Sequence, residues 1–453
     1  MGAAKSIFCA SRTQAEIELF EHLVARYPRR DFRVEFWDGS IWGGDQPRFT
    51  LILRHPGALR RMFLAPSELA LGQAYISNEF DISGDIEAAF GFGDYLLNQT
   101  RTLPERLKLA VLLRKLPTGN PTQPGRHQGN FHGFIHSKAR DRQAISYHYD
   151  LPSEFYALWL DRRMVYSCAY FNTPEDDLDA AQLRKLDYIC RKLRLRAGER
   201  FLDVGCGWGG LILHAAKYYN VDALGITLSA PQAEVASERI RRAGLESKCR
   251  VAVCDYRELA GGEPFDKIAS VGMFEHVGEK LLSTYFSQAW QLLKPGGVLL
   301  NHGISYSATY HRRGPSFIDR YVFPDADLVP VSSSLQAAEN SGFEVRDVES
   351  LREHYALTLR RWVRRLEDQA DEARRITNDA TYRIWRIYLA GSAHGFCSGR
   401  LNVYQTLLSK PSVRGQSGLP LTREDWYRDK LASSPVMPAA RTTAQVCHRN
   451  NKA

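Results

Sequence analysis

A glycine-rich turn with an acidic residue before it carries the strongest chemical signal in the chain. Asp203 lies in a short apolar stretch, and the glycines that follow it are Gly205, Gly207, Gly209 and Gly210. Glycines between a strand and a helix let a ligand approach the backbone, where the first N–H groups of the helix lack partners. The turn alone is a weak signal, because it also fits the dinucleotide-binding pattern.

Several neighbouring residues favour S-adenosylmethionine over a nicotinamide dinucleotide. The Asp203 carboxylate can receive a cationic amino group, and the pattern D-x-G-x-G-x-G is typical of enzymes that use S-adenosylmethionine. The next apolar run ends in Thr227 instead of the acid that would bind a ribose diol, and Gln232 offers a neutral substitute. Asp255 follows the third run, where it can bind the exocyclic amine of adenine. The turn at 294–297 precedes the fifth run, as in many methyltransferases.

Short apolar runs separated by stretches of helical length must position these residues. The runs occupy residues 200–204, 222–226, 250–254, 265–271 and 298–301. Such alternation predicts an α/β domain with a doubly wound, mainly parallel sheet, because parallel strands need helical crossovers. The stretch 351–410 is predicted as a further, helical layer rich in aromatic residues.

The N-terminal segment has a different pattern. Residues 13–27 open with a capping-box spacing and then show apolar residues at helical intervals. Alternating stretches at 32–36 and 49–54 follow, and we interpret them as β-hairpin strands. Residues 1–113 are therefore predicted to form a smaller α+β domain.

Composition sets the remaining boundaries. Residues 114–143 are rich in proline, glycine and basic residues, which indicates a basic linker. The sheet domain is expected over residues 144–410, and residues 411–453 form a polar C-terminal tail.

The overall composition excludes several classes of protein. Of 453 residues, 44% are hydrophobic and 25% charged, which is typical of folded globular chains and not of collagen-like or disordered ones. The eight cysteines show no zinc-type spacing, and we expect neither disulfides nor a metal site. No apolar run is long enough to span a bilayer, and the first residues lack the apolar core of a signal peptide, so we expect a cytoplasmic protein. The net charge of +9 favours an anionic partner, but no nucleic-acid-binding signature is present.

A series of motifs extends over residues 140–410. They are YHYDLPSEFY at 147–156, YSCAYF at 166–171, the glycine turn, GITLS at 225–229, MFEHVG at 273–278 and HYALTL at 354–359. In this order they resemble the cyclopropane-fatty-acyl-phospholipid synthases and the mycolic acid cyclopropane synthases. The N-terminal segment, with GQAYI at 72–76 and DISGD at 81–85, resembles the extra domain of longer members that act on phospholipids. The resemblance implies a seven-stranded Rossmann-like methyltransferase domain with a smaller N-terminal domain.

The resemblance also implies which residues form the site. It assigns contacts with S-adenosylmethionine to Tyr166, Ser167, Asp203, Gly205, Gly207, Gly209, Thr227, Gln232, Asp255 and Tyr256. It assigns a bicarbonate ion near the transferred methyl group to Cys168, Glu275, His302, the main chain of Ile304, and Tyr355. A purely structural role stays open for the side chains of this second group. Glu275 could be an acid at a helix start, His302 a core imidazole, Cys168 a buried thiol and Tyr355 a packed ring.

The expected reaction is difficult for chemical reasons. A cis double bond is a weak nucleophile, so the sulfonium methyl must be held in line with its π electrons. Methyl transfer leaves a carbocation that water would quench, so a dry pocket must contain a base that removes one proton and closes a cyclopropane ring. We therefore expect one open cavity to join the nucleoside pocket to Glu275, His302 and Tyr355.

One position departs from the family pattern. Synthases of this family usually have a cysteine where this chain has Ser392, and Cys397 lies five residues further along the predicted helix, where it would point elsewhere. The substitution leaves a methyl-branched lipid product open. Methylation of a small molecule also stays open, as does a non-catalytic, lipid-binding role.

The expected substrate is a membrane phospholipid with unsaturated acyl chains. We therefore expect a peripheral protein that docks on the anionic inner face of the membrane, and a homodimer is left open. Basic clusters at 60–61, 114–142 and 360–365 are candidate headgroup contacts. The stretch 107–113 is either an interfacial amphipathic helix or an ordinary packed one.

Overall fold

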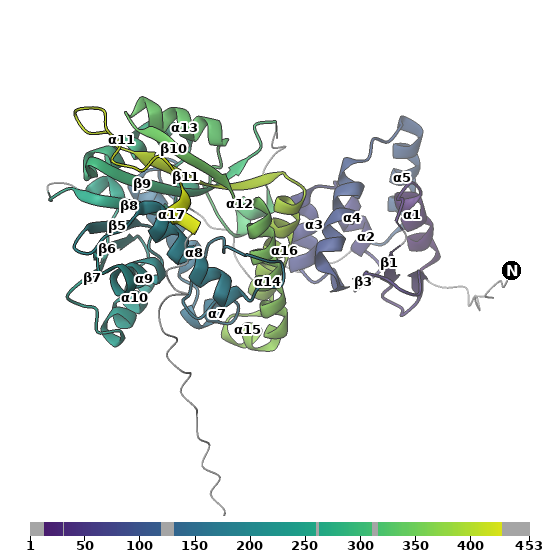
Figure 1. Cartoon of the computed structure of the whole chain (residues 1–453). Coiled ribbons are helices and arrows are strands. Elements are labelled where there is room, and N and C mark those ends of the chain that lie inside the picture. Colours follow the sequence, from purple (N-terminus) through teal and green to yellow (C-terminus); the bar gives the residue numbers. More distant parts are fainter. Residues whose placement is uncertain (1–12, 30, 119–130, 260–261, 310–315, 428–453) are drawn as a thin grey trace, which may run out of the picture. The chain divides into compact units, whose positions relative to one another are not determined.

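A seven-stranded sheet forms the centre of the larger domain (Figure 1). Its strands are β5 (Arg200–Val204), β6 (Asp222–Thr227), β7 (Cys249–Val253), β8 (Phe265–Val271), β9 (Leu293–Tyr306), β10 (Glu344–Ser350) and β11 (Leu401–Ser409). Among the described residues their order is β10-β11-β9-β8-β5-β6-β7. β5 to β9 pair in parallel, so the predicted doubly wound sheet is confirmed.

Strands β10 and β11 have no counterpart among the predicted strands. β11 pairs antiparallel with both β9 and β10, and places Gln405 opposite His302. β10 has the largely polar sequence EVRDVES, and β11 falls within the stretch predicted as helical. Their pairing partners are distant in sequence, so the local pattern does not reveal them.

Helices connect the strands and cover the sheet (Figure 1). The helices of this domain are α6 (Lys138–Tyr149), α7 (Ser153–Ala157), α8 (Leu178–Leu193), α9 (Gly210–Tyr219), α10 (Ala230–Arg242), η1 (Tyr256–Glu258), η2 (Phe274–His276), η3 (Glu279–Leu281), α11 (Leu282–Leu292), α12 (Phe317–Tyr321), α13 (Val331–Asn340), α14 (Arg352–Asp368), α15 (Ala370–Ile376) and α16 (Asp379–Cys397). Side-chain caps explain where several begin: Asp177 caps α8, Ser229 caps α10 and Asn378 caps α16.

The N-terminal domain contains a second sheet. Its strands are β1 (Phe32–Glu35), β2 (Ile41–Gly43), β3 (Phe49–Leu53) and β4 (Phe80–Gly84), in the order β2-β1-β3-β4. Its helices are α1 (Gln14–Val24), α2 (Ala58–Phe63), α3 (Glu68–Ile76), α4 (Ile86–Asn98) and α5 (Leu103–Lys115). The two stretches predicted as β-hairpin material form β1 and β3. β1 forms an antiparallel hairpin with the short strand β2, whereas β1 and β3 pair in parallel, so the second stretch is not the hairpin partner of the first.

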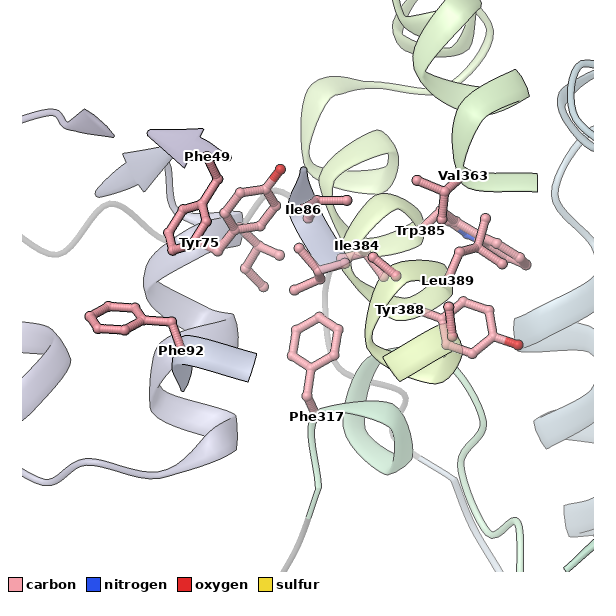
Figure 2. Close-up of a cluster of buried hydrophobic side chains, with 14 of the residues drawn as sticks. Phe49, Tyr75, Ile86, Phe92, Phe317, Val363, Ile384, Trp385, Tyr388 and Leu389 are labelled. Carbon is pink, nitrogen blue, oxygen red and sulfur yellow. The ribbon is translucent and has the colours of Figure 1, made fainter. Parts of the chain in front are cut away.

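One hydrophobic core continues from the N-terminal domain into α16 (Figure 2). Phe49, Tyr75 and Phe92 of the N-terminal domain belong to the same buried cluster as Ile384 and Trp385. Packing over this shared core joins the two domains by the hydrophobic effect.

Arg383 adds a polar tie between the two domains. Its side chain is 3% exposed and donates hydrogen bonds to the carbonyl oxygens of Tyr75 (2.7 Å) and Phe80 (2.6 Å) and to Asp81 Oδ2 (2.9 Å). The neighbouring Arg386 donates to Tyr75 Oη (2.7 Å). These bonds satisfy a buried charge that would otherwise be costly.

The segment predicted as a linker is partly helical. α5 extends to Lys115 and α6 begins at Lys138, so residues 138–143 belong to a helix of the larger domain. Arg140 of α6 forms a bidentate ion pair with Asp325 (2.6 and 2.9 Å), which fixes this helix.

The structure is a computed structural model that describes residues 13–427 except 30, 119–130, 260–261 and 310–315. Residues up to Gly418 belong to one unit, and a second unit starts at Leu419 and includes α17 (Glu424–Tyr427). The boundary thus lies later than the predicted one at 410, because residues 411–418 fold back in a turn in which Ser412 N donates to Gln416 O. Most of the predicted tail and the middle of the predicted linker lie outside the described residues.

Candidate active site

The glycine turn joins β5 to α9 with a backbone that favours glycine. Gly205 and Gly207 have φ angles of +83° and +54°, in the left-handed region. A Cβ atom on Gly205 would lie 2.8 Å from Cβ of Met273, so a larger residue does not fit there. The N–H groups of Gly205 and Cys206 both donate to Ile226 O (2.9 Å each), which fixes the turn against β6.

A cavity lies where the carboxyl ends of the parallel strands meet. Its wall includes the predicted cofactor residues Tyr166, Ser167, Asp203, Gly205, Gly207, Thr227, Gln232, Asp255 and Tyr256. Gly209 is not part of this wall; a Cβ there would lie 3.1 Å from Cβ of Ala236, so Gly209 lets the turn approach α10. The fold therefore gathers these residues, and their binding role stays a prediction.

The Asp203 carboxylate is suited to bind a cationic group. Its side chain is 2% exposed on β5, and Oδ1 has no hydrogen-bond partner among the described residues. Burial raises the pKa of Asp203 to about 7, although the nearby Lys185 ammonium lowers it. A buried carboxylate oxygen without a donor fits the amino group of S-adenosylmethionine.

Thr227 and Gln232 form a neutral pair at the end of β6. Thr227 Oγ1 donates to Gln232 Oε1 (2.8 Å), and Ser229 N donates to Thr227 Oγ1 (3.2 Å). The Ser229 hydroxyl also accepts from Gln232 N (3.4 Å), which caps α10. Both predicted residues thus have fixed positions on the cavity wall and carry no charge.

Asp255 lies on the wall but is already paired. Arg257 donates to both of its carboxylate oxygens, through Nε (2.9 Å) and Nη2 (2.6 Å), and also binds Asp141 of α6 (2.8 Å). Burial would raise the pKa of Asp255, but the Arg257 guanidinium holds it below its usual range. An adenine amine would therefore share this carboxylate with Arg257.

Glu275 is held at one end of its carboxylate and free at the other. The short helix η2 places it beside β9, where Ile304 N donates to Glu275 Oε1 (2.7 Å). Glu275 Oε2 has no partner among the described residues, and the side chain is 7% exposed. Burial raises the pKa of Glu275 to about 7. The resemblance assigns the main chain of Ile304 to bicarbonate, and the N–H of that main chain is occupied by Glu275.

His302 is a buried, neutral imidazole with one free nitrogen. Gln405 Nε2 on the neighbouring strand lies 3.2 Å from His302 Nδ1, which accepts from this amide. This places the ring proton on Nε2, which has no partner within the described part of the chain. Burial and the charges of Lys185 and Lys192 lower the pKa of His302 well below its ordinary value.

Tyr355 and Cys168 are both buried in their protonated forms. Burial raises the pKa of Tyr355, and the nearby Glu275 and Cys168 add to the effect. The Tyr355 ring packs on Phe396 (4.6 Å between centroids). The Cys168 thiol donates to Leu351 O (3.7 Å), and burial raises its pKa, so it is not a thiolate nucleophile.

Tyr149 of the cavity wall and Tyr388 both lie near enough to Glu275 for its charge to raise their pKa values. Tyr166 Oη and Tyr388 Oη are 3.0 Å apart, and the Tyr149 and Tyr166 rings lie edge to face (6.2 Å). The cavity wall includes Tyr149 and Tyr166 but not Glu275, His302 or Tyr355, contrary to the expectation of one cavity for both groups. Met273 and His276, which flank Glu275 closely in sequence, are part of that wall.

Several site residues are absent from the sequence predictions. They are Tyr149, Lys185, Arg257, Tyr388 and Gln405. Tyr149 lies inside the first motif, which is a signal that could have identified it. The others carry no local pattern, because their partners come from distant strands and helices.

Comparison with known proteins gives matches over most of the chain. Residues 136–406 match the family described as mycolic acid cyclopropane synthetase, and residues 19–91 match a domain of unknown function. A solved mycolic acid cyclopropane synthase in complex with SAH and CTAB has 34% sequence identity and a TM-score of 0.56, covering 59% of this chain and 97% of that one.

Two curated relatives differ in their named activities. The "Probable fatty acid methyltransferase" of Pseudomonas putida is 41% identical over 87% of this chain and 96% of its own length. The cyclopropane-fatty-acyl-phospholipid synthase of Escherichia coli is 37% identical over 62% of this chain and 71% of its own length.

Proposed function

Because this chain belongs to the mycolic acid cyclopropane synthetase family of S-adenosylmethionine-dependent methyltransferases, we propose that it closes a cyclopropane ring on an unsaturated phospholipid acyl chain. The observation that carries this assignment is the Glu275 carboxylate, fixed by Ile304 N–H and left open at Oε2. Tyr149, which lines the cofactor cavity, and Tyr388 both interact electrostatically with this carboxylate. A site of this kind suits a reaction that passes through a cation and ends with loss of a proton.

The first step depends on position. The Asp203 carboxylate would hold the amino group of the cofactor, and the glycine turn allows the nucleoside to lie against β5. Tyr149 and Tyr166 of the same wall would help to enclose the sulfonium group that the cofactor supplies. Holding the methyl in line with the double bond supplies much of the rate enhancement.

The second step, in which the carbocation loses a proton and closes the ring, needs a pocket without water and a base. The rings of Tyr149, Tyr166 and Tyr388 exclude water, and their π faces stabilise the passing positive charge. Glu275 Oε2 and His302 Nε2 are unpartnered in the described residues and fit the donors and acceptors of a bicarbonate ion. When bound there, bicarbonate would supply the base that takes the methyl proton. Because its pKa is about 7, Glu275 can accept a hydrogen bond without strong repulsion between anions.

A second product is favoured by two specific observations. Relatives over most of this chain are named fatty acid methyltransferases, and Ser392 replaces the usual cysteine. A methyl-branched chain would arise from the same cation if the proton were lost elsewhere along the acyl chain. Both products need the same cofactor and the same dry pocket.

Incubation with isotope-labelled S-adenosylmethionine and vesicles of unsaturated phospholipid separates the two products. Acyl-chain mass analysis should show the gain of one methylene with loss of the double bond. The same gain with the double bond retained would favour the branched product. Vesicles of fully saturated phospholipid serve as the control, and label in those chains would contradict both reactions.

We also propose that α5 brings the enzyme to the membrane. Leu103, Leu107 and Val111 form a stripe at helical spacing and are 71%, 60% and 54% exposed. The opposite face packs Leu109 and Leu112 into the domain core. Four basic residues on the same helix would attract anionic headgroups: Arg106, Lys108, Arg114 and Lys115. Among the described residues, no helix is both long and apolar enough to cross a bilayer.

Other predicted headgroup contacts are engaged within the protein. Arg360 binds Glu87 (2.6 and 2.7 Å), and Arg61 pairs with the buried Glu79. α5 differs from these clusters in its exposed apolar stripe, although Lys115 also lies 3.9 Å from Glu18.

Vesicle flotation tests the docking surface. The double variant Leu107→Glu with Val111→Glu should reduce binding to anionic vesicles at least about tenfold, since each change removes an inserting side chain and adds a repelled charge. Val348→Glu on β10 is the control, because Val348 is exposed but lies in the other domain. Equal loss in both variants, or none in the double variant, would contradict the role of α5.

A further inference from the structure

Two lysines are completely buried in α8, and they differ in their partners. Lys192 Nζ contacts the carboxylates of Asp347 (3.4 Å) and Glu349 (2.5 Å). Lys185 has no carboxylate within ion-pair distance among the described residues, and its one hydrogen bond there is to Ser167 Oγ (2.6 Å). A buried ammonium group with one neutral partner is expensive to maintain, which points to a ligand.

Lys185 lies on the wall of the cofactor cavity together with Ser167 and Asp203. Its side chain comes from α8, and that of Asp203 comes from β5. Burial lowers the pKa of Lys185 to about 8, and Cys168, Asp161 and Asp203 act in the opposite direction. The ammonium therefore remains largely charged at neutral pH and has N–H groups left over after its bond to Ser167.

The methionine end of the cofactor is a zwitterion, with an ammonium and a carboxylate on the same carbon. Its recognition in a buried site needs an anion for one group and a cation for the other, placed close together. Asp203 supplies the anion through its unpartnered Oδ1. We propose that Lys185, together with the Ser167 hydroxyl, binds the carboxylate of S-adenosylmethionine.

Lys185 is not among the residues that the sequence motifs assign to the cofactor. This inference rests on the family's dependence on S-adenosylmethionine and is independent of the acyl substrate. A purely structural lysine would balance the Asp203 charge and stabilise the fold, but it would not distinguish ligands with and without a carboxylate.

Calorimetric titration of the full chain with S-adenosylmethionine and with its decarboxylated analogue tests this distinction. The wild type should bind S-adenosylmethionine about 10- to 100-fold more tightly, the range expected for a hydrogen bond between charged groups. Lys185→Met should lose this factor for S-adenosylmethionine and bind the decarboxylated analogue within about threefold of the wild type. Lys185→Arg should recover part of the discrimination.

Lys267→Met is the matched control, because Lys267 is a buried lysine of β8 that is not on the cavity wall. It should keep the full discrimination. Equal weakening of both ligands by Lys185→Met would overturn the assignment. So would a wild type that binds the two ligands equally, a result that requires no variant to fold. Failure of the wild type to bind either ligand would instead refute its use of the cofactor.

Discussion

The buried carboxylate of Glu275 gives the sharpest prediction. Its ionised form should destabilise the folded protein, although the same carboxylate supports turnover. Burial raises its pKa from 4.5 to about 7. The folded protein binds the Glu275 proton more tightly than the unfolded chain does. The resulting contribution to the free energy of unfolding is fully present below pH 4.5 and is lost as the pH rises to about 7. At 1.36 kcal/mol per pKa unit, the ionised side chain costs about 3 kcal/mol at pH 8 and about 1 kcal/mol at pH 5.

Glu275→Gln removes this cost and keeps the shape of the side chain. The amide oxygen can still accept from Ile304 N, so we expect the fold to be retained. The melting temperature should rise relative to the wild type, and it should rise more at pH 8 than at pH 5. Product formation should fall at least about tenfold, because one charge-assisted hydrogen bond is worth about 1.5–3 kcal/mol.

Scanning calorimetry at both pH values, with the vesicle assay at pH 8, checks both expectations. The affinity for S-adenosylmethionine should stay within about threefold of the wild type, because Glu275 is not on the cavity wall. Glu279→Gln is the control, since Glu279 is an exposed glutamate four residues further along the chain, at the start of η3. A melting shift that is equal at the two pH values, or full activity in Glu275→Gln, would refute the reasoning.

Three further variants address the cofactor turn, the reaction centre and the domain junction. Gly205→Ala should weaken S-adenosylmethionine binding at least about tenfold in calorimetry, because Gly205 has a positive φ and a Cβ atom there would meet Met273. Gly244→Ala is the control: a Cβ atom on Gly244 meets no other atom within 4 Å, so cofactor binding should not change. Tyr355→Phe should reduce ring formation at least about tenfold in the vesicle assay and leave cofactor affinity within a few-fold; equal loss of both would contradict its role at the reaction centre. Arg383→Met should lower the melting temperature and speed proteolysis of the N-terminal domain. The substitution leaves buried carbonyl acceptors unpaired, at a cost of about 3–5 kcal/mol in the free energy of unfolding. An unchanged melting curve would show that the apolar core alone joins the domains.

The strongest sequence predictions concern features that neighbouring residues encode. The glycine turn follows β5 directly, and the five parallel strands are apolar runs with helical crossovers between them, so short windows of sequence were sufficient. Most of the predicted cofactor residues, such as Asp203, Thr227 and Asp255, lie at the carboxyl ends of these strands, which the topology brings to one edge of the sheet. The motifs also indicated the family.

The tertiary structure decided what depends on pairing between distant residues. The parallel pairing of β1 with β3 and the antiparallel β11 depend on sheet register, which local patterns do not specify. Gln405 orients His302 across that register, from more than a hundred residues away.

The same holds for the charges in the site. Lysines at positions 185 and 192 look alike in sequence, but folding gives one of them two carboxylate partners and leaves the other facing the cavity. The sequence alone thus determined which groups are available for chemistry. The fold determined their partners and their protonation, because desolvation and Coulomb interactions depend on distances that only the folded chain sets.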